Sequence, residues 1–246
     1  MQKVYSRTKT LQEDKVVGFC PGCMHSTVIK LIGEALDELN VADKAVCVTG
    51  IGCCGLLMDY IAYDNITAPH GRACAVATGI KRNNPDSLVF TYQGDGDFAS
   101  IGLAESMSAA NRGENFSVIF INNGIYGMTG GQMAPTTLVG MKASTAPKGR
   151  DPKEHGYPMH MCEILNQLTA PVYLERTSCN TPQNVMKTKN AIKKAFRNQL
   201  EGKGFSMVEI VTSCPTNWGL SPLAALDFIE QKMLPEFPLG VVRDRT

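Results

Sequence analysis

Runs of consecutive apolar residues mark the strands that this sequence predicts. They occupy residues 45–49 (AVCVT), 88–92 (LVFTY) and 117–121 (SVIFI), and shorter or later runs follow at 172–174 and 206–211. These runs do not alternate between apolar and polar positions, as they would in a sheet with one face in water. They are typical of parallel strands that are buried on both faces. We therefore predict a mainly parallel sheet.

The segments between these runs have the periodicity of helices. Residues 26–40 place apolar side chains at steps of four, four and three, on one helical face, namely Val28, Ile32, Leu36 and Leu39. Residues 98–112 and 182–200 predict two more helices, and most lysines of the second lie off its apolar face, as on a solvated helix. Strands that alternate with helices predict an α/β fold with helices on both faces of the sheet.

Three segments fall outside this alternation. Residues 1–17 are polar and predict an N-terminal arm before a main domain at 18–216. Residues 217–246 predict a C-terminal tail that contacts another subunit and holds a helix near 223–233. Residues 133–161 are rich in Gly, Pro, Thr and Lys without periodicity, and predict a long loop. Loops of this length are usually functional or form contact surfaces.

The composition excludes several classes of protein. The 246 residues carry 24 Lys and Arg against 23 Asp and Glu, a formal net charge of +1, which leaves no basic excess for nucleic acid. The 43% of hydrophobic residues is typical of a globular chain. The sequence has no apolar stretch of the ~18 residues that span a membrane, and its start lacks the apolar core of a signal peptide. We expect a cytoplasmic protein without nucleic-acid or membrane partners.

Polar residues follow two of the predicted strands. Gly94-Asp95-Gly96-Asp97 comes after the run at 88–92, and Asn122-Asn123-Gly124 comes after the run at 117–121. Ligands of open α/β sheets bind at the carboxyl ends of strands. Glycines let the backbone approach phosphate oxygens, and Mg²⁺ prefers carboxylate and amide oxygens. Each motif alone is typical of a turn, but both together predict a magnesium–diphosphate site with Asp95 and Asn123 as ligands.

Nine cysteines in a chain of this length indicate metal ligation or catalysis better than disulfides. Cys20-Pro21-Gly22-Cys23 is compatible with a redox pair, with half of a zinc site that includes His25, or with half of an iron–sulfur site. Cys53 and Cys54 in GIGCCG, and Cys214 in SCPT, follow predicted strands at the edge where the GDGD loop is expected. The remaining cysteines are expected as small buried hydrophobes, namely Cys47, Cys74, Cys162 and Cys179.

The full set of motifs resembles a known family. CPGC, GIGCCG, PHGRA, ATGIKRNNPD, GDGD, NNGIYGMTGGQMAPTT and SCPT occur in this order. With them the chain resembles the β subunit of 2-oxoacid:ferredoxin oxidoreductases from about Phe19 to Pro215. GDG followed by NN, with residues 97–121 between them, is similar to the motif that binds thiamine diphosphate. The resemblance implies the thiamine-diphosphate-binding fold, a mainly parallel sheet flanked by helices on both faces.

The resemblance also implies roles for particular residues. Mg²⁺ is expected on Asp95, Asn123 and the carbonyl of Ile125. One 4Fe–4S cluster is expected on Cys20, Cys23, Cys53 and Cys214, with Cys54 as an alternative ligand that more plausibly lines the thiamine site. The residues expected around thiamine diphosphate are Gly52, Cys54, His70, Gly94, Asp95, Gly96, Asp97, Asn123, Ile125, Gly127, Met128 and Thr129. His70 and Cys54 are the candidates for supporting catalysis, and no acid–base residue is assigned.

The reaction implied is the oxidative decarboxylation of a 2-oxoacid to an acyl-coenzyme A and CO₂, with electrons passing through the cluster to ferredoxin. A partner of the α or γ type is expected to supply the pyrimidine-binding domain with its glutamate, and a ferredoxin-like subunit to relay electrons. Apolar Leu56, where relatives that use 2-oxoglutarate are expected to carry a basic residue, favours 2-oxoisovalerate over 2-oxoglutarate or pyruvate. The alternatives are a non-redox thiamine-dependent decarboxylase and an iron–sulfur or zinc scaffold.

Overall fold

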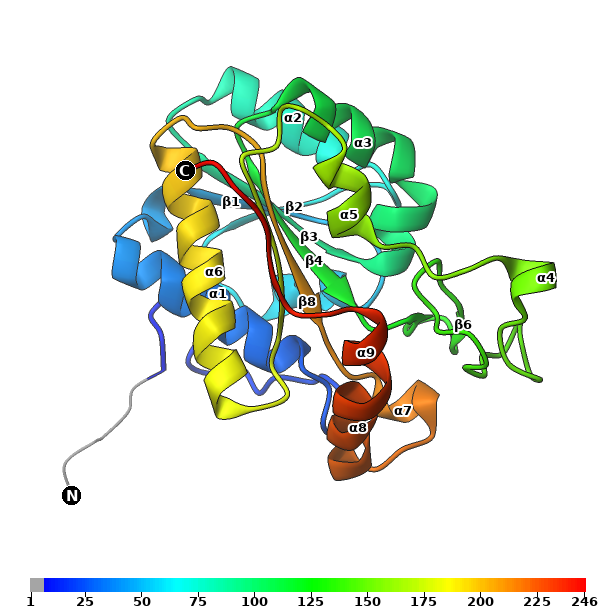
Figure 1. Cartoon of the computed structure of the whole chain (residues 1–246). Coiled ribbons are helices and arrows are strands. Elements are labelled where there is room, and N and C mark those ends of the chain that lie inside the picture. Colours follow the sequence, from blue (N-terminus) through cyan, green and yellow to red (C-terminus); the bar gives the residue numbers. More distant parts are fainter. Residues whose placement is uncertain (1–6) are drawn as a thin grey trace.

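The computed structural model describes residues 7–246. Its main sheet has seven strands in the order β2-β1-β3-β4-β8-β7-β9, parallel except for the last pair (Figure 1). Beside it lies a two-stranded antiparallel ribbon, β5–β6. The strands are β1 (Ala45–Thr49), β2 (Asp64–Thr67), β3 (Leu88–Gly94), β4 (Ser117–Asn122), β5 (Ile125–Tyr126), β6 (Gln132–Met133), β7 (Tyr173–Ser178), β8 (Ser206–Val211) and β9 (Gly240–Asp244).

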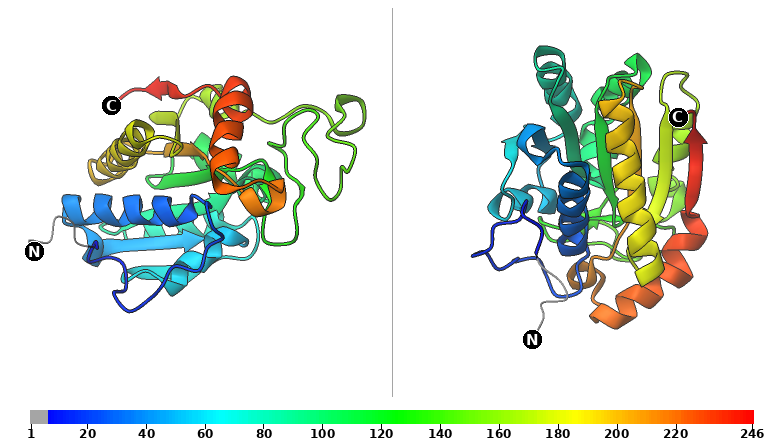
Figure 2. Two further views of the ribbon diagram at one scale, coloured as in Figure 1. Left: turned by 90° about the horizontal axis from the view of Figure 1, so that it is seen from below. Right: turned by 90° about the vertical axis from the view of Figure 1, so that its left-hand side faces the viewer.

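Helices cover both faces of the sheet. The α-helices are α1 (His25–Leu39), α2 (Ala73–Asn83), α3 (Leu103–Arg112), α4 (Pro152–His155), α5 (Met161–Asn166), α6 (Pro182–Leu200), α7 (Pro215–Trp218), α8 (Pro222–Phe228) and α9 (Leu234–Glu236). Turns of 3-10 helix occupy Ala42–Lys44 and Cys53–Asp59, and π-helical turns occupy Asp97–Ile101 and Ile229–Met233. Helices α1 and α6 pack on one face, and α2, α3 and α5 on the other (Figures 1 and 2). The predicted α/β architecture is confirmed.

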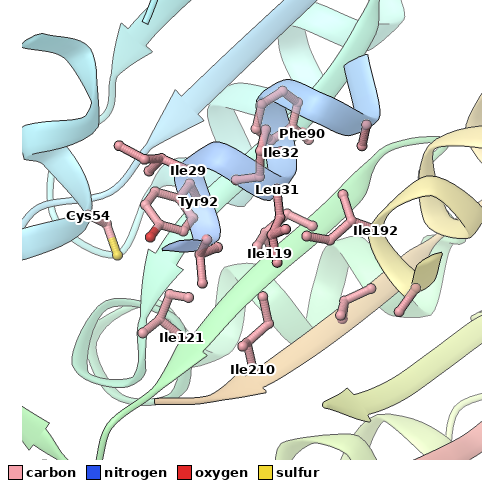
Figure 3. Packing of buried hydrophobic residues seen from close by; sticks show 14 of the residues in the cluster. Ile29, Leu31, Ile32, Cys54, Phe90, Tyr92, Ile119, Ile121, Ile192 and Ile210 are labelled. Carbon is pink, nitrogen blue, oxygen red and sulfur yellow. The ribbon is translucent and has the colours of Figure 1, made fainter. Parts of the chain in front are cut away.

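The continuous apolar runs are explained by two separate cores. In β4, Ile119 and Ile121 point into the core beneath α1 and α6, whereas Val118 and Phe120 point into the core beneath α2, α3 and α5. Successive side chains of a strand face opposite sides, so a strand between two helical layers is apolar at every position. Figure 3 shows the first core, in which Ile119 lies beside Ile192. The rings of Phe90 and Phe196 pack against each other in the same core.

Both ends of the chain contribute to the domain. Leu11 is buried in the first core and forms a β-bridge with Ile61, and Thr8 and Thr10 are buried as well. Thr8, Thr10 and Leu11 of the expected arm therefore pack on the domain, and residues 13–16 are exposed, whereas residues 1–6 lie outside the described residues. At the other end, β9 pairs with β7 and completes the sheet. The predicted helix near 223–233 is present as α8 and the π-helical turn that follows it.

Residues 134–160 form the long excursion that the sequence predicts, interrupted by α4 (Figure 1). The guanidinium of Arg150 organises it by donating to the carbonyls of residues 135, 137, 155, 156 and 157. Arg150 is 5% exposed. In the described part of the chain, no helix combines the length and apolar character needed to cross a bilayer.

Candidate functional site

A cavity lies at the carboxyl ends of β1, β3 and β4, where loops from three strands converge. It is lined by His25, Ile51, Gly52, Cys53, Cys54, His70, Gly94, Asp95, Gly96, Asp97, Asn123, Ile125, Tyr126, Gly127, Met128 and Thr129. All twelve residues expected around thiamine diphosphate are among them. The structure thus brings together the GIGCCG, PHGRA, GDGD and NNGIYGMT motifs, which are far apart in the sequence.

Asp95 is held at the end of β3 by uncharged donors. Its Oδ1 accepts the N–H of Gly96 at 2.9 Å, and its Oδ2 accepts the hydroxyl of Thr136 at 2.5 Å. Burial raises the pKa of Asp95 to about 6, although these bonds and the backbone N–H groups of Asn123 and Gly124 act in the opposite direction. A buried carboxylate without a cationic partner is costly, so this position favours a bound cation.

The turn after β4 faces Asp95. Asn123 Oδ1 accepts the N–H of Ile125 at 3.1 Å, which fixes the turn around Gly124, whose φ is +68°. The carbonyl of Gly124 accepts the Thr137 hydroxyl at 2.6 Å. The side chain of Asn122 is directed elsewhere, because its Nδ2 donates to buried Glu209 at 2.8 Å. Of the two asparagines, only Asn123 lines the cavity.

Asp97 holds a second part of the cavity wall in place through hydrogen bonds. Its Oδ1 accepts the N–H of Gly71 at 2.7 Å and contacts His70 Nδ1 at 2.5 Å, and its Oδ2 accepts the Gln93 amide at 2.5 Å. A proton on Nδ1 leaves Nε2 of the imidazole as the acceptor. Gly50 passes so close that a Cβ there would lie 2.2 Å from Asp97 Oδ2. The PHGRA loop is therefore attached to the GDGD loop through Asp97.

The glycine between the two aspartates is required by an aromatic ring. A Cβ at Gly96 would lie 2.1 Å from Tyr126 Cε1, and the Tyr126 hydroxyl donates to the Gly96 carbonyl at 3.2 Å. The ring of Tyr126 thus packs against Gly96, which precedes the π-helical turn Asp97–Ile101. Any side chain at position 96 would displace this ring.

Four cysteines gather next to this cavity. Burial raises the pKa of Cys23 to about 12 and that of Cys53 to about 11, and the pKa of Cys214 is raised as well. Cys20 is exposed. Each of the six pairs among Cys20, Cys23, Cys53 and Cys214 is close enough for charge on one sulfur to disfavour charge on the other.

The CPGC loop is fixed against the end of β8. The Ser213 hydroxyl donates to the Gly22 carbonyl at 2.7 Å, which brings the loop beside Cys214. Within residues 7–246, no three His, Cys, Asp or Glu side chains converge tightly enough to hold a single metal ion. His25, which the zinc alternative for CPGC includes, has its Nδ1 2.5 Å from the Tyr92 hydroxyl.

The other cysteines are buried, as the sequence predicts. Burial raises the pKa of Cys74 and Cys179 to about 12, and that of Cys47 and Cys162 well above the usual value. Cys54 is also buried but lines the cavity, so it differs from these four in its position.

Two expected residues have different surroundings from those that the motifs imply. Leu56 packs against the first core and is not among the residues that line the cavity. The Thr129 hydroxyl, expected to face a diphosphate, donates to Gln132 Oε1 at 2.5 Å.

Sequence reasoning missed several residues that build the site. Thr136 and Gln93 bond to the two aspartates, and Tyr126 covers Gly96. Thr136 and Tyr126 lie within the NNGIYGMTGGQMAPTT motif, which was the available signal. Gln93 directly precedes GDGD in the sequence.

Comparisons with known proteins agree with this geometry. The thiamine pyrophosphate enzyme, C-terminal TPP binding domain family matches residues 50–210. The 2-oxoglutarate synthase subunit KorB of Methanocaldococcus jannaschii is 37% identical over 213 residues, which cover 86% of this chain and 74% of that protein. The chain belongs to the thiamine pyrophosphate-binding subunits of the 2-oxoacid:ferredoxin oxidoreductase family.

The chain is also similar to a longer relative and to a solved structure. The ketoisovalerate oxidoreductase subunit VorA of Methanothermobacter thermautotrophicus is 50% identical over 228 residues, 93% of this chain but 48% of that protein. The chain therefore spans about half the length of that relative. A structure of the 2-oxoglutarate:ferredoxin oxidoreductase from Magnetococcus marinus, with 2-oxoglutarate, coenzyme A and succinyl-CoA bound, matches with a TM-score of 0.80 and 25% identity. The match covers 99% of this chain and 86% of that one. The predicted family and fold are confirmed.

Proposed function

We propose that this chain holds magnesium–thiamine diphosphate and one 4Fe–4S cluster in an enzyme that oxidatively decarboxylates a 2-oxoacid to an acyl-coenzyme A and CO₂ and passes the electrons to ferredoxin. The observation that carries the proposal is the position of Cys53. This residue lines the cavity and also belongs to the group of four thiols. Two centres that share a wall suit a reaction in which decarboxylation is followed by electron removal.

The cavity fits a magnesium–diphosphate group. Asp95 offers a buried carboxylate whose hydrogen-bond partners are all uncharged, and Asn123 and Ile125 lie on the turn that faces it. These are hard oxygen ligands of the type that Mg²⁺ shares with phosphates. We assign Mg²⁺ to Asp95, Asn123 and the carbonyl of Ile125.

The thiol group fits an iron–sulfur cluster better than a single metal ion. Four sulfurs that influence each other's ionisation, without convergence on one point, suit a centre larger than one ion. Cysteine thiolates are the usual ligands of 4Fe–4S clusters. We assign the cluster to Cys20, Cys23, Cys53 and Cys214, and place Cys54 on the cavity side.

When bound, thiamine diphosphate would supply a nucleophilic carbon for the reaction with the substrate ketone. The chain's own residues position and polarise this site. Asp97 orients His70 so that Nε2 is the ring nitrogen available to a ligand in the cavity, and it also holds the backbone of Gly71. The apolar side chains of Ile51 and Met128 border the cavity and are both exposed.

The substrate that we favour is 2-oxoisovalerate. Support comes from the 50% identity to a ketoisovalerate oxidoreductase subunit, compared with 37% to a 2-oxoglutarate synthase subunit. Because the chain spans about half of that first relative, we propose that further subunits or domains supply the pyrimidine-binding half of the site, a coenzyme A site and the ferredoxin contact. Pyruvate and 2-oxoglutarate are the alternative substrates.

Anaerobic purification of the chain with its partner subunits tests the proposal. We expect a brown protein that contains thiamine and, for each copy of this chain, at least the four irons and four sulfides of one cluster. Protein with thiamine but without iron would indicate a non-redox decarboxylase, and a metal protein without thiamine would indicate a scaffold. Turnover of 2-oxoisovalerate above that of pyruvate and 2-oxoglutarate would support the substrate assignment, and a preference for 2-oxoglutarate would overturn it.

A further inference from the structure

One side chain connects the group of four thiols to the wall of the cavity. Helix α7 begins directly after Cys214, and Asn217 lies on it. Asn217 Nδ2 donates to the Gly127 carbonyl at 2.9 Å and to Cys214 Sγ at 3.3 Å. A single amide group thus contacts a sulfur expected to bind the cluster and a backbone carbonyl of the loop that lines the cavity.

Gly127 lies close to two of the sulfurs. A Cβ at this position would lie 3.3 Å from Cys53 Sγ, 3.5 Å from Cys214 Sγ and 3.7 Å from Asn217 Nδ2. A side chain at this position would therefore meet two thiols, and Gly127 also lines the cavity.

Asn217 also lies close to Gly131, at the other end of the same loop. A Cβ at Gly131 would lie 3.1 Å from Asn217 Oδ1, and the φ of Gly131 is +83°. The N–H of Gly131 donates to the Tyr126 carbonyl at 2.9 Å, which closes residues 126–131 into a compact loop. Asn217 is thus held between the two ends of the loop that presents Met128 and Thr129 to the cavity.

We infer that Asn217 is a positioning residue that couples the two cofactor sites, by donating a hydrogen bond to the cluster ligand Cys214 and by fixing the Gly127 carbonyl of the diphosphate loop. This inference rests on the proposed function, because it requires both cofactors. Reduction adds negative charge to a cluster, and a donor directed at a ligating sulfur stabilises that charge. Asn217 therefore raises the reduction potential of the cluster.

The test compares Asn217→Leu, similar in size but without a donor, with the unchanged chain. Both are purified anaerobically with their partner subunits, and the midpoint potential of this cluster is measured by redox titration followed by electron paramagnetic resonance. We expect a shift to lower potential in Asn217→Leu. Calorimetric titration of the cofactor-depleted protein with thiamine diphosphate and Mg²⁺ should show Kd about two- to tenfold higher, since one hydrogen bond to the loop is lost.

Two matched variants distinguish the loss of the Asn217 hydrogen bonds from a general disturbance of the fold. Thr216→Ala changes an exposed neighbour on the same helix and should leave both the potential and Kd unchanged. Asn217→Gln retains an amide donor and should recover part of both losses. If leucine is not accommodated, Asn217→Ala serves for the same comparison.

The outcomes distinguish the inference from the proposed function. A cluster with an unshifted potential in the variants that lack the donor would overturn the role of Asn217, even if Kd changes. An unchanged chain that shows no 4Fe–4S signal after anaerobic purification would instead overturn the proposed function.

Discussion

The Thr136 hydroxyl donates to Asp95 Oδ2 at 2.5 Å, across 41 positions of the sequence. Thr136 belongs to the long excursion after β6, whereas Asp95 directly follows β3. Arg150 fixes this contact, because one of its guanidinium nitrogens donates to the carbonyls of Pro135 and Thr137 on either side of Thr136. The excursion is therefore part of the candidate magnesium site.

Thr136→Val should weaken the binding of magnesium–thiamine diphosphate. Valine has a similar shape but cannot donate, and a hydrogen bond to a charged group contributes about 1.5–3 kcal/mol, which corresponds to a Kd roughly 10- to 100-fold higher. Thr136→Ser keeps the hydroxyl and should retain most of the affinity. Calorimetric titration with Mg²⁺ and thiamine diphosphate measures both. Equal affinity in Thr136→Val and Thr136→Ser would show that the hydroxyl does not support the site.

Binding of the same complex should depend on pH through Asp95. Burial raises its pKa from 3.8 to about 6 in the metal-free protein. Because burial favours the neutral carboxyl, Asp95 costs the folded protein no stability below about pH 3.8. The folded protein loses free energy of unfolding as the pH rises through 6 and the buried carboxyl ionises. Mg²⁺ binds the ionised form, so the increase in Tm on adding magnesium–thiamine diphosphate should be large at pH 7 and should shrink below pH 6.

Asp95→Asn provides the control for this pH dependence. The amide neither ionises nor offers a carboxylate to Mg²⁺, so the increase in Tm should be small at every pH. If the increase in Tm of the unchanged chain is the same at pH 7 and at pH 5, Asp95 is not the group that makes cofactor binding depend on pH.

Much of the fold could be predicted because both faces of the sheet are covered. The apolar runs that mark β1, β4 and β8 have the bounds of the strands to within one residue, and α6 spans Pro182–Leu200 as the periodicity predicts. Strands β2 and β9 were missed because they lie at the edges, where mostly exposed residues replace the apolar run. Helix α2 was missed because its buried face consists mostly of small residues, Ala73, Cys74 and Ala77, in place of the large aliphatic side chains that mark α1.

The site was predictable where a motif shows its chemistry locally. Gly96 and Asp95 can be recognised because a glycine and a carboxylate follow a strand. The bonds from Thr136 and Gln93 could not be predicted, since they depend on how segments meet in the folded chain. The same holds for Asn217, whose amide reaches the loop at Gly127 only through the position of α7.

His25 should make the protein sensitive to acid. Burial lowers its pKa from 6.5 to about 4, and the neutral ring is close to the Tyr92 hydroxyl. A lowered pKa of a base means that its contribution to stability is present above 6.5 and is lost as the pH falls through 4. This shift in pKa corresponds to a loss of free energy of unfolding on the order of 3 kcal/mol at low pH. Asp95 has the opposite effect, because it lowers stability as the pH rises.

Chemical denaturation at pH 7 and at pH 4 measures this contribution. His25→Gln, which cannot be protonated, should lose less free energy of unfolding between the two pH values than the unchanged chain does. A loss of equal size in both proteins would show that other groups control the sensitivity to acid.

Arg176→Met should destabilise the fold strongly. Arg176 is 1% exposed, and its Nε lies 3.0 Å from Oε2 of fully buried Glu209. Removing the cation leaves Glu209 buried without a counter-charge, which costs about 3–5 kcal/mol. Glu209 also accepts the Asn122 amide at 2.8 Å, next to the candidate magnesium ligand Asn123. We therefore expect a lower free energy of unfolding together with weaker binding of magnesium–thiamine diphosphate.

The double variant Arg176→Met with Glu209→Gln identifies the cause. Glutamine removes the uncompensated charge but still accepts from Asn122, so denaturation should show that much of the lost stability returns and titration should show that cofactor affinity returns with it. If the double variant is as unstable as Arg176→Met alone, the cost comes from other contacts of the guanidinium, such as its bonds to Glu163, because those are absent from both variants.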